Sequence, residues 1–170
     1  MYPVCAPGAE RHTIRAPRGR QAYRMQIRTT RFGPLDIEAD DVIQFPAGLL
    51  GMEDCRAWVL LADAQNDALG WLQSTTRPEV ALAVVSPRRF VPDYQFRVFR
   101  SELTTLTLGD VKTAQVLVIV GKHECAITLN LKAPVVINLQ RRLGRQVVAN
   151  GDQPVQFELT TIPAPLKKSA

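Results

Sequence analysis

The chain has 170 residues, of which 46% are hydrophobic and 22% are charged, and it carries a formal charge of +5. This composition is that of an ordinary soluble globular protein with enough apolar material for one core, and it gives little reason to expect two domains. No apolar run approaches the ~18 residues that a membrane helix needs, and the cysteines and histidines lack the spacing of metal ligands. The sequence therefore predicts a reduced, cytoplasmic protein that has no metal or other cofactor.

The charge is unevenly distributed along the chain. Residues 1–24 hold five arginines against a single acidic residue, Glu10, a net charge of +4. Residues 36–67 hold eight acidic residues against a single basic residue, Arg56, a net charge of −7. The basic total suggests a nucleic-acid-binding protein, but the acidic segment would repel phosphate and would instead attract a cationic protein.

The two ends of the chain differ in composition from the middle. Residues 1–24 combine prolines, glycines and arginines without a hydrophobic period, so we interpret them as a flexible extension. A regular pattern begins at Met25, which could therefore be the true initiator. Residues 25–160 form the predicted β domain, and residues 161–170 form a C-terminal tail.

Short segments rich in β-branched and aromatic residues follow one another from Met25 to Leu159. The first alternates into a Gly33-Pro34 turn, and most of the others are bounded by Gly, Pro, Asn or Asp, as is typical of strands. Further strands are expected at residues 42–45, 58–62, 71–74, 80–86, 94–99, 116–120, 126–131, 135–139, 146–149 and 155–159. About ten short strands predict a single-domain all-β fold, barrel-like or sandwich-like. At most one short helix is expected, capped by Ser101, with Leu103 and Leu106 facing inward.

The sequence offers little that could support catalysis. His123 lies in a polar Gly-Lys-His-Glu turn, where we expect a solvated side chain, and His12 lies in the extension. Cys125 is expected to begin a strand and to pack as a small hydrophobe. Because nucleotide-binding and metalloprotease motifs are also absent from the sequence, we predict that the protein is not an enzyme.

Two amides interrupt an apolar region. Asn130 and Asn138 lie on either side of a bend that Pro134 fixes. A buried amide has donors and an acceptor that must be satisfied. Each asparagine therefore either bonds the backbone near the bend or meets a partner, and the sequence leaves both readings open.

Five short motifs follow one another in the chain: Met25-Gln-Ile-x-Thr-x-x-Phe-Gly33, Ile43-x-Phe-Pro-x-Gly-Leu-x-Gly51, Trp71-Leu-Gln-Ser74, Phe90-x-Pro-Asp-Tyr94, and Asn130-Leu-x-Ala-Pro-Val-x-Ile-Asn138 with Gly144-x-Gln-Val147. Each motif alone is weak. Their order, from Met25 to about Leu159, closely resembles that of the flagellar assembly factor FliW family. Met52 departs from the pattern, because the family usually has an aromatic residue there.

The resemblance implies a small, non-enzymatic, β-barrel-like protein, expected to be a monomer. Such a protein would bind the translational regulator CsrA, an RNA-binding protein, and so relieve repression of flagellin mRNA translation. It would also bind flagellin, which competes for it, and direct binding to nucleic acid or to a membrane is not expected. The candidate partner-binding residues fall into two groups: an acidic group expected to steer CsrA, Asp36, Glu38, Asp40 and Asp41, and a polar group expected to line a groove for a partner segment, Gln73, Tyr94, Asn130 and Asn138.

The alternative function is a nucleic-acid-binding β-barrel that works through its arginine-rich N-terminal arm. Binding of this kind would be strongly salt-sensitive and would disappear when residues 1–24 were removed.

Overall fold

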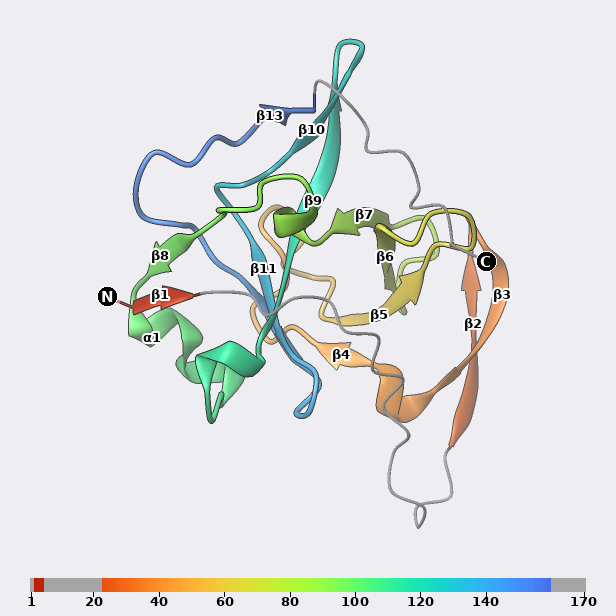
Figure 1. The fold of residues 1–170 in the computed structure, drawn as a ribbon. Helices are drawn as coiled ribbons and strands as arrows, with labels where there is room; N and C mark the ends of the chain where they lie inside the picture. Colours follow the sequence, from red (N-terminus) through yellow and green to blue (C-terminus); the bar gives the residue numbers. More distant parts are fainter. Residues whose placement is uncertain (1, 5–22, 160–170) are drawn as a thin grey trace, which may run out of the picture.

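The computed structural model describes residues 2–4 and 23–159 (Figure 1). The expected C-terminal tail, residues 161–170, and most of the expected extension lie outside the described residues.

Seven strands form a closed barrel. Around the barrel they are β11 (Val135–Asn138), β12 (Leu143–Gln146), β4 (Ile43–Gln44), β5 (Ala57–Ala62), β6 (Leu69–Ser74), β7 (Ala81–Val85) and β9 (Gln115–His123). Pairing of β9 with β11 closes the ring, and neighbouring strands are antiparallel except β12 and β4, which are parallel. The barrel-like form of the predicted all-β fold is therefore confirmed.

The remaining strands add to the outside of the barrel. β2 (Arg24–Thr29) and β3 (Gly33–Glu38) form a separate hairpin, and β1 (Tyr2–Val4) pairs with β8 (Phe96–Val98). β10 (Ala126–Leu129) forms a hairpin with the end of β9, and β13 (Phe157–Glu158) pairs with β10. Figure 1 shows the β2–β3 hairpin and the β1–β8 pair on opposite sides of the barrel.

Helical structure in the described residues is limited to short segments. These are α1 (Arg100–Leu103) and the 3-10 turns η1 (Ala39–Asp41), η2 (Pro87–Arg89), η3 (Thr104–Leu106) and η4 (Val111–Thr113). Figure 1 shows α1 beside β8.

The bend predicted at Pro134 lets one strand bind two partners in succession. β9 pairs with β10 through residues 120–123 and with β11 through residues 115–117. The N–H of Asn130 still donates to the carbonyl of Ile119 on β9 at 3.0 Å, whereas residues 131–134 leave the ladder. The side-chain Oδ1 of Asn130 accepts a hydrogen bond from the N–H of Ala133 at 3.0 Å. The chain thus passes from the outer β9–β10 hairpin into the barrel wall, and β9 is the partner strand both before and after the bend.

The apolar side chains form three clusters. Residues from the barrel strands fill its interior, among them Phe45, Trp58, Leu72, Leu117 and Ile137. The outer faces of β9 and β11 pack against β8, β10 and η3, and the outer face of β5 packs against the β2–β3 hairpin. Because both faces of β11 are covered, all four of its residues are buried, Asn138 included.

Several local predictions need correction. α1 has Phe99, not Ser101, at its N-cap and no side-chain capping bond, although Leu106 is buried as expected. The strands expected at 94–99, 146–149 and 155–159 are shorter or shifted, because pairing, rather than residue type, sets their limits: β12 begins at Leu143, opposite Asn138. Cys125 is exposed in the turn between β9 and β10, so it does not pack as a small hydrophobe.

Inside the barrel, the aromatic ring of Phe45 packs directly against the backbone of Gly144. Phe45 is fully buried and contacts the ring of Trp58 edge-on, with 6.4 Å between centroids. A Cβ at position 144 would lie only 2.6 Å from Cε1 of Phe45. The absence of a side chain at Gly144 on β12 therefore leaves the space that the ring of Phe45 occupies.

We expect the substitution Gly144→Ala to lower the free energy of unfolding by about 1–3 kcal/mol, the usual cost of overpacking a tight interior. Chemical denaturation would measure the loss. Gly109→Ala is the matched control, since a Cβ there meets nothing within 4 Å. Equal stabilities for the two variants would show that Phe45 does not occupy this position.

Candidate partner-binding surface

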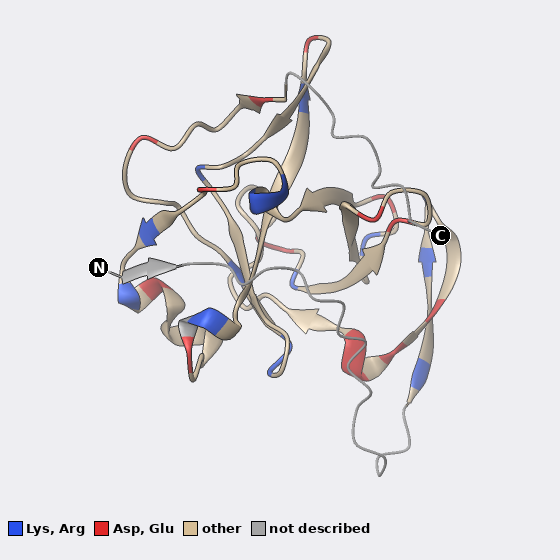
Figure 2. Cartoon of the chain, in the orientation of Figure 1, with Lys and Arg blue, Asp and Glu red and all other residues tan. Residues whose placement is uncertain are grey.

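The acidic candidates lie close together on the surface, with Glu38 half-buried and the other three exposed. Asp36 and Glu38 lie on β3, and Asp40 and Asp41 lie in η1, which follows directly. On β3, Ile37 faces the core while the residues on either side of it face outward, as strand alternation requires. We call these four residues the acidic edge; Figure 2 shows it as a run of red along β3 and η1.

Neighbouring basic residues reduce the charge of the acidic edge. Arg24 on β2 lies directly opposite Glu38, and an Nη2 of Arg142 lies 3.5 Å from Oδ1 of Asp41. The Asp41–Arg142 pair is exposed, so its attraction is weak in water and it leaves the carboxylate accessible. The other acidic residues of the 36–67 segment lie elsewhere, with Asp67 paired to Arg89 at 3.3 Å. The −7 segment is thus not a single patch on the surface.

Gln73 lies on β6, and its side chain is fully buried. It is opposite Val59, on the face of the sheet that the β2–β3 hairpin covers. Its Nε2 donates to the carbonyl oxygens of Ser74 at 2.9 Å and Val80 at 3.0 Å. The side-chain oxygen Oε1 has no hydrogen-bond partner. Gln73 therefore ties β6 to the turn that leads into β7.

Tyr94 is buried in the cluster on the outer face of β9 and β11. Its hydroxyl donates to the carbonyl oxygen of Leu131 at 2.8 Å, and its ring stacks on Phe96 with 5.8 Å between centroids. Burial raises the pKa of the hydroxyl, because the phenolate would be poorly solvated there. Tyr94 holds the segment before β8 against the bend at residues 130–134.

Asn138 ends β11 and bonds the backbone in two directions. Its Nδ2 donates to the carbonyl of Leu106 at 2.9 Å. Its Oδ1 accepts from the N–H groups of Gln140 at 3.1 Å and Arg141 at 3.2 Å, in the turn before β12. Of the two alternatives that the sequence left open, both Asn138 and Asn130 therefore fit the first, in which the amide bonds the backbone near the bend.

The four polar candidates do not line a common groove in the described structure. Gln73 lies beneath the β2–β3 hairpin, whereas Tyr94, Asn130 and Asn138 lie on the other side of the barrel. Gln73, Tyr94 and Asn138 are each at most 6% exposed. In the described structure the polar groups of these four residues bond backbone groups, and their role in partner binding stays a prediction.

An aromatic clamp, which we define as Arg31, Phe32, Asp63 and Trp71, fastens the hairpin to the barrel. Trp71 on β6 meets the ring of Phe32 edge-on at 5.8 Å, and the guanidinium of Arg31 lies 3.8 Å from the centre of its indole. The indole N–H donates to Oδ2 of Asp63 at 2.9 Å. The sequence motif contained Trp71 but gave no sign of Asp63, which lies in a different turn.

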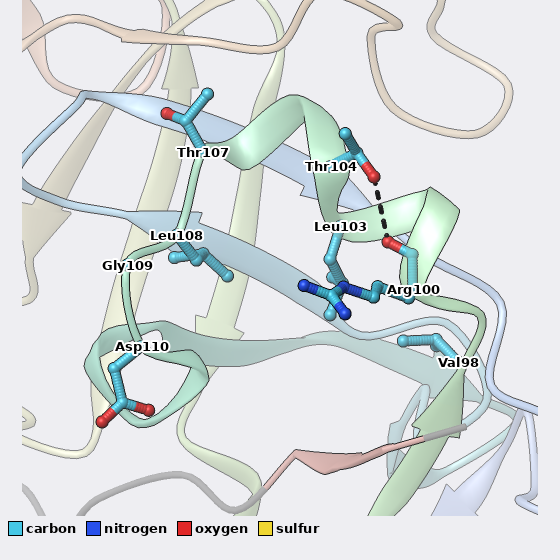
Figure 3. A pocket seen from close by; sticks show the side chains of 8 residues that line it. All are labelled: Val98, Arg100, Leu103, Thr104, Thr107, Leu108, Gly109 and Asp110. Atoms are coloured by element: carbon cyan, nitrogen blue, oxygen red, sulfur yellow. Dashed lines mark hydrogen bonds between the residues drawn. The ribbon is translucent and has the colours of Figure 1, made fainter.

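A cavity of about 470 Å³ opens on the side opposite the hairpin. Val98, Leu103 and Leu108 give it an apolar wall, the guanidinium of Arg100 reaches in beside Leu103, and Asp110 lies to one side (Figure 3). Phe99, which lies between the lining residues Val98 and Arg100 in the sequence, is 56% exposed. Sequence reasoning missed this feature, because its walls come from residues that are unremarkable in the chain.

Comparison with known proteins identifies the family. The sequence model described as "FliW protein" matches residues 26–159. The chain belongs to the FliW family. The flagellar assembly factor FliW of Natranaerobius thermophilus is 35% identical over 127 residues, which cover 73% of this chain and 84% of the relative. The flagellar assembly factor FliW of Bdellovibrio bacteriovorus is 37% identical over 126 residues, which cover 73% of this chain and 72% of the relative.

A solved structure supports the same assignment. The crystal structure of a flagellar assembly factor FliW superposes on this FliW-family chain with a TM-score of 0.72 at 27% identity, covering 79% of this chain and 96% of the other. In the described residues, no helix is long and apolar enough to cross a membrane.

We expect Asn138→Ala to lower the free energy of unfolding by about 1–3 kcal/mol, because it leaves a buried carbonyl and two turn amides without partners. Thermal unfolding would measure the loss, with the exposed Gln140→Ala in the same turn as the control. Weaker partner binding at unchanged unfolding temperature would contradict the structural role.

We expect the aromatic clamp to loosen in acid. The bond from Trp71, followed by the bond from the Gln65 amide, lowers the pKa of Asp63 from its ordinary value of 3.8. Because the folded-state pKa lies below the unfolded value, this stabilisation is present above pH 3.8 and is lost as the pH falls through the folded pKa. An NMR titration of the Trp71 indole N–H should show the change.

Two controls accompany this titration. The indole N–H of Trp58 donates to the backbone carbonyl of Cys55 at 2.9 Å, and since that acceptor does not titrate, its signal should stay constant until the whole protein unfolds. Asp63→Asn should remove the pH response of Trp71. A shift at both indoles in step would mean global unfolding rather than release of the clamp.

Proposed function

We propose that this protein acts in flagellar assembly as a non-enzymatic partner switch in the cytoplasm. As a monomer, it binds the translational regulator CsrA and so relieves repression of flagellin mRNA translation, and it binds flagellin as the competing partner. The free concentration of CsrA then follows the supply of flagellin by mass action. The observation that carries the proposal is the match to the FliW family over residues 26–159.

The acidic edge supports the choice of a cationic partner. It presents carboxylates on β3 and η1 that are mostly exposed, and CsrA, an RNA-binding protein, must carry a basic surface to hold phosphate. Charges at the rim of an interface mainly accelerate encounter and discriminate between partners. In this proposal the acidic edge steers CsrA toward the protein.

The candidate polar residues play an indirect part in binding. Since Gln73, Tyr94, Asn130 and Asn138 bond backbone groups, we propose that they hold the shape of the surface for a partner rather than contact it. Their substitution would then weaken binding only together with stability.

The first experiment is a titration of the full chain with CsrA from the same organism, repeated with flagellin present and with target RNA as a control ligand. Tight CsrA binding that flagellin reverses is the expected result. RNA binding without CsrA binding would contradict the proposal, and its disappearance in a chain of residues 25–170 would assign it to the N-terminal arm.

We expect reversal of the charges at Glu38, Asp40 and Asp41 to lysine to slow CsrA association and to flatten its dependence on salt. Stopped-flow measurements at several ionic strengths would show the effect. The matched control reverses three exposed acidic residues on the opposite part of the surface, Glu124, Asp152 and Glu158, and so makes the same change in net charge. Equal slowing by both triple variants would assign the effect to net charge alone.

A further inference from the structure

The outer strand β8 has two hydrogen-bonding edges. On one edge, the N–H of Asn150 donates to the carbonyl of Arg97 at 2.7 Å. On the other, β1 pairs antiparallel in the register Tyr2↔Val98, Pro3↔Arg97, Val4↔Phe96. Because backbone groups point alternately to the two edges of a strand, those of Phe96 and Val98 face β1 when those of Arg97 face Asn150.

This register suits the sequence of β1. Pro3 lies opposite Arg97, which is the position where an antiparallel pair exchanges no hydrogen bonds. The missing N–H of proline therefore costs no ladder bond there, as in natural edge strands. A shift by one residue would place Pro3 opposite Phe96 or Val98, where its N–H would be needed.

The strand that receives β1 is firmly held and borders the cavity. The side chains of Phe96 and Val98 are only 2% and 1% exposed, packed in the cluster on the outer face of β9 and β11. Val98 also lines the cavity beside α1, which Figure 3 shows at the end of β8. A firmly held strand whose edge is covered by only three residues, with a hollow beside it, is an arrangement that can accept an extended peptide by strand addition.

We propose that the edge of β8 that residues 2–4 cover in cis is an acceptor site for an extended peptide strand. A strand of three residues makes few ladder bonds, so a longer extended segment of a protein partner can displace it. The N-terminal segment then acts as a removable cover over an interaction surface. This inference goes beyond the proposed function and does not depend on it.

Proline substitution in the full chain tests whether residues 2–4 cover the edge. Val4→Pro removes an N–H that the register directs at Phe96, whereas Pro3→Ala alters the neighbouring position without removing a donor. Amide exchange of Phe96 and Val98, measured by NMR, should accelerate by about tenfold or more in Val4→Pro and stay unchanged in Pro3→Ala. The Asn150 amide, which bonds the other edge, should stay protected in all three proteins.

A peptide added in trans tests whether the edge accepts a free strand. Tethered segments typically experience an effective concentration on the order of millimolar. A reduced peptide of residues 1–8 at such a concentration should restore slow exchange at Phe96 and Val98 of the Val4→Pro protein, whereas the same peptide carrying Val4→Pro should not.

Two results would overturn the proposal. Equal exchange at Phe96 and Val98 in the wild-type and Val4→Pro proteins would show that residues 2–4 do not cover the edge. Failure of the wild-type peptide to protect better than its proline variant would show that the edge does not accept a strand in trans. Neither result bears on CsrA or flagellin binding, so the proposed function is tested separately, by the CsrA titration.

Discussion

The bend between β10 and β11 is the constraint on which the rest of the structure depends. β9 is long enough to pair with both strands, but only if residues 131–134 leave the ladder between them. Asn130 and the buried Pro134 fix that excursion, and the hydroxyl of Tyr94 bonds the carbonyl of Leu131 within it. The barrel closes because β11 then returns to β9 in register, and the cluster that holds β8 forms on its outer face.

Satisfaction of buried backbone explains most of the polar residues in the family motifs. Gln73 and Asn138 bind carbonyl groups in turns, and Gln146 bridges the N–H of Leu50 and the carbonyl of Ala133 at 3.0 Å each. Gly48 has a positive φ of 68°, and a Cβ there would collide with the backbone of Glu53. These residues specify the shape of the barrel.

The sequence predicted the strands better than their pairing. β5, β6, β7 and β9 lie where turn residues and β-branched runs predicted them, since both signals are local. The clamp of Trp71 with Arg31 and Asp63, and the fit of Phe45 against Gly144, arise between residues far apart in the chain, so no local pattern could indicate them. The acidic edge is recognisable in the sequence as four closely spaced carboxylates, but Arg24 and Arg142 are brought beside it only by folding. The role of the amides could not be decided either, because an asparagine that bonds backbone and one that awaits a partner look the same in one sequence.

The parallel contact between β12 and β4 is the part of the barrel wall with the fewest paired residues. Its ladder consists of the single pair Leu143↔Gln44, supplemented by a bond from the N–H of Gln44 to the carbonyl of Arg142 at 2.8 Å. It joins segments distant in the chain, so its formation carries a larger loop-closure entropy than a hairpin of the barrel does. Local opening is expected to begin where the fewest bonds must break. Only Val42 separates η1 from β4, and Arg142 bonds Gln44 through its carbonyl and Asp41 through its side chain, so the acidic edge is mechanically coupled to the part of the barrel wall with the fewest backbone bonds.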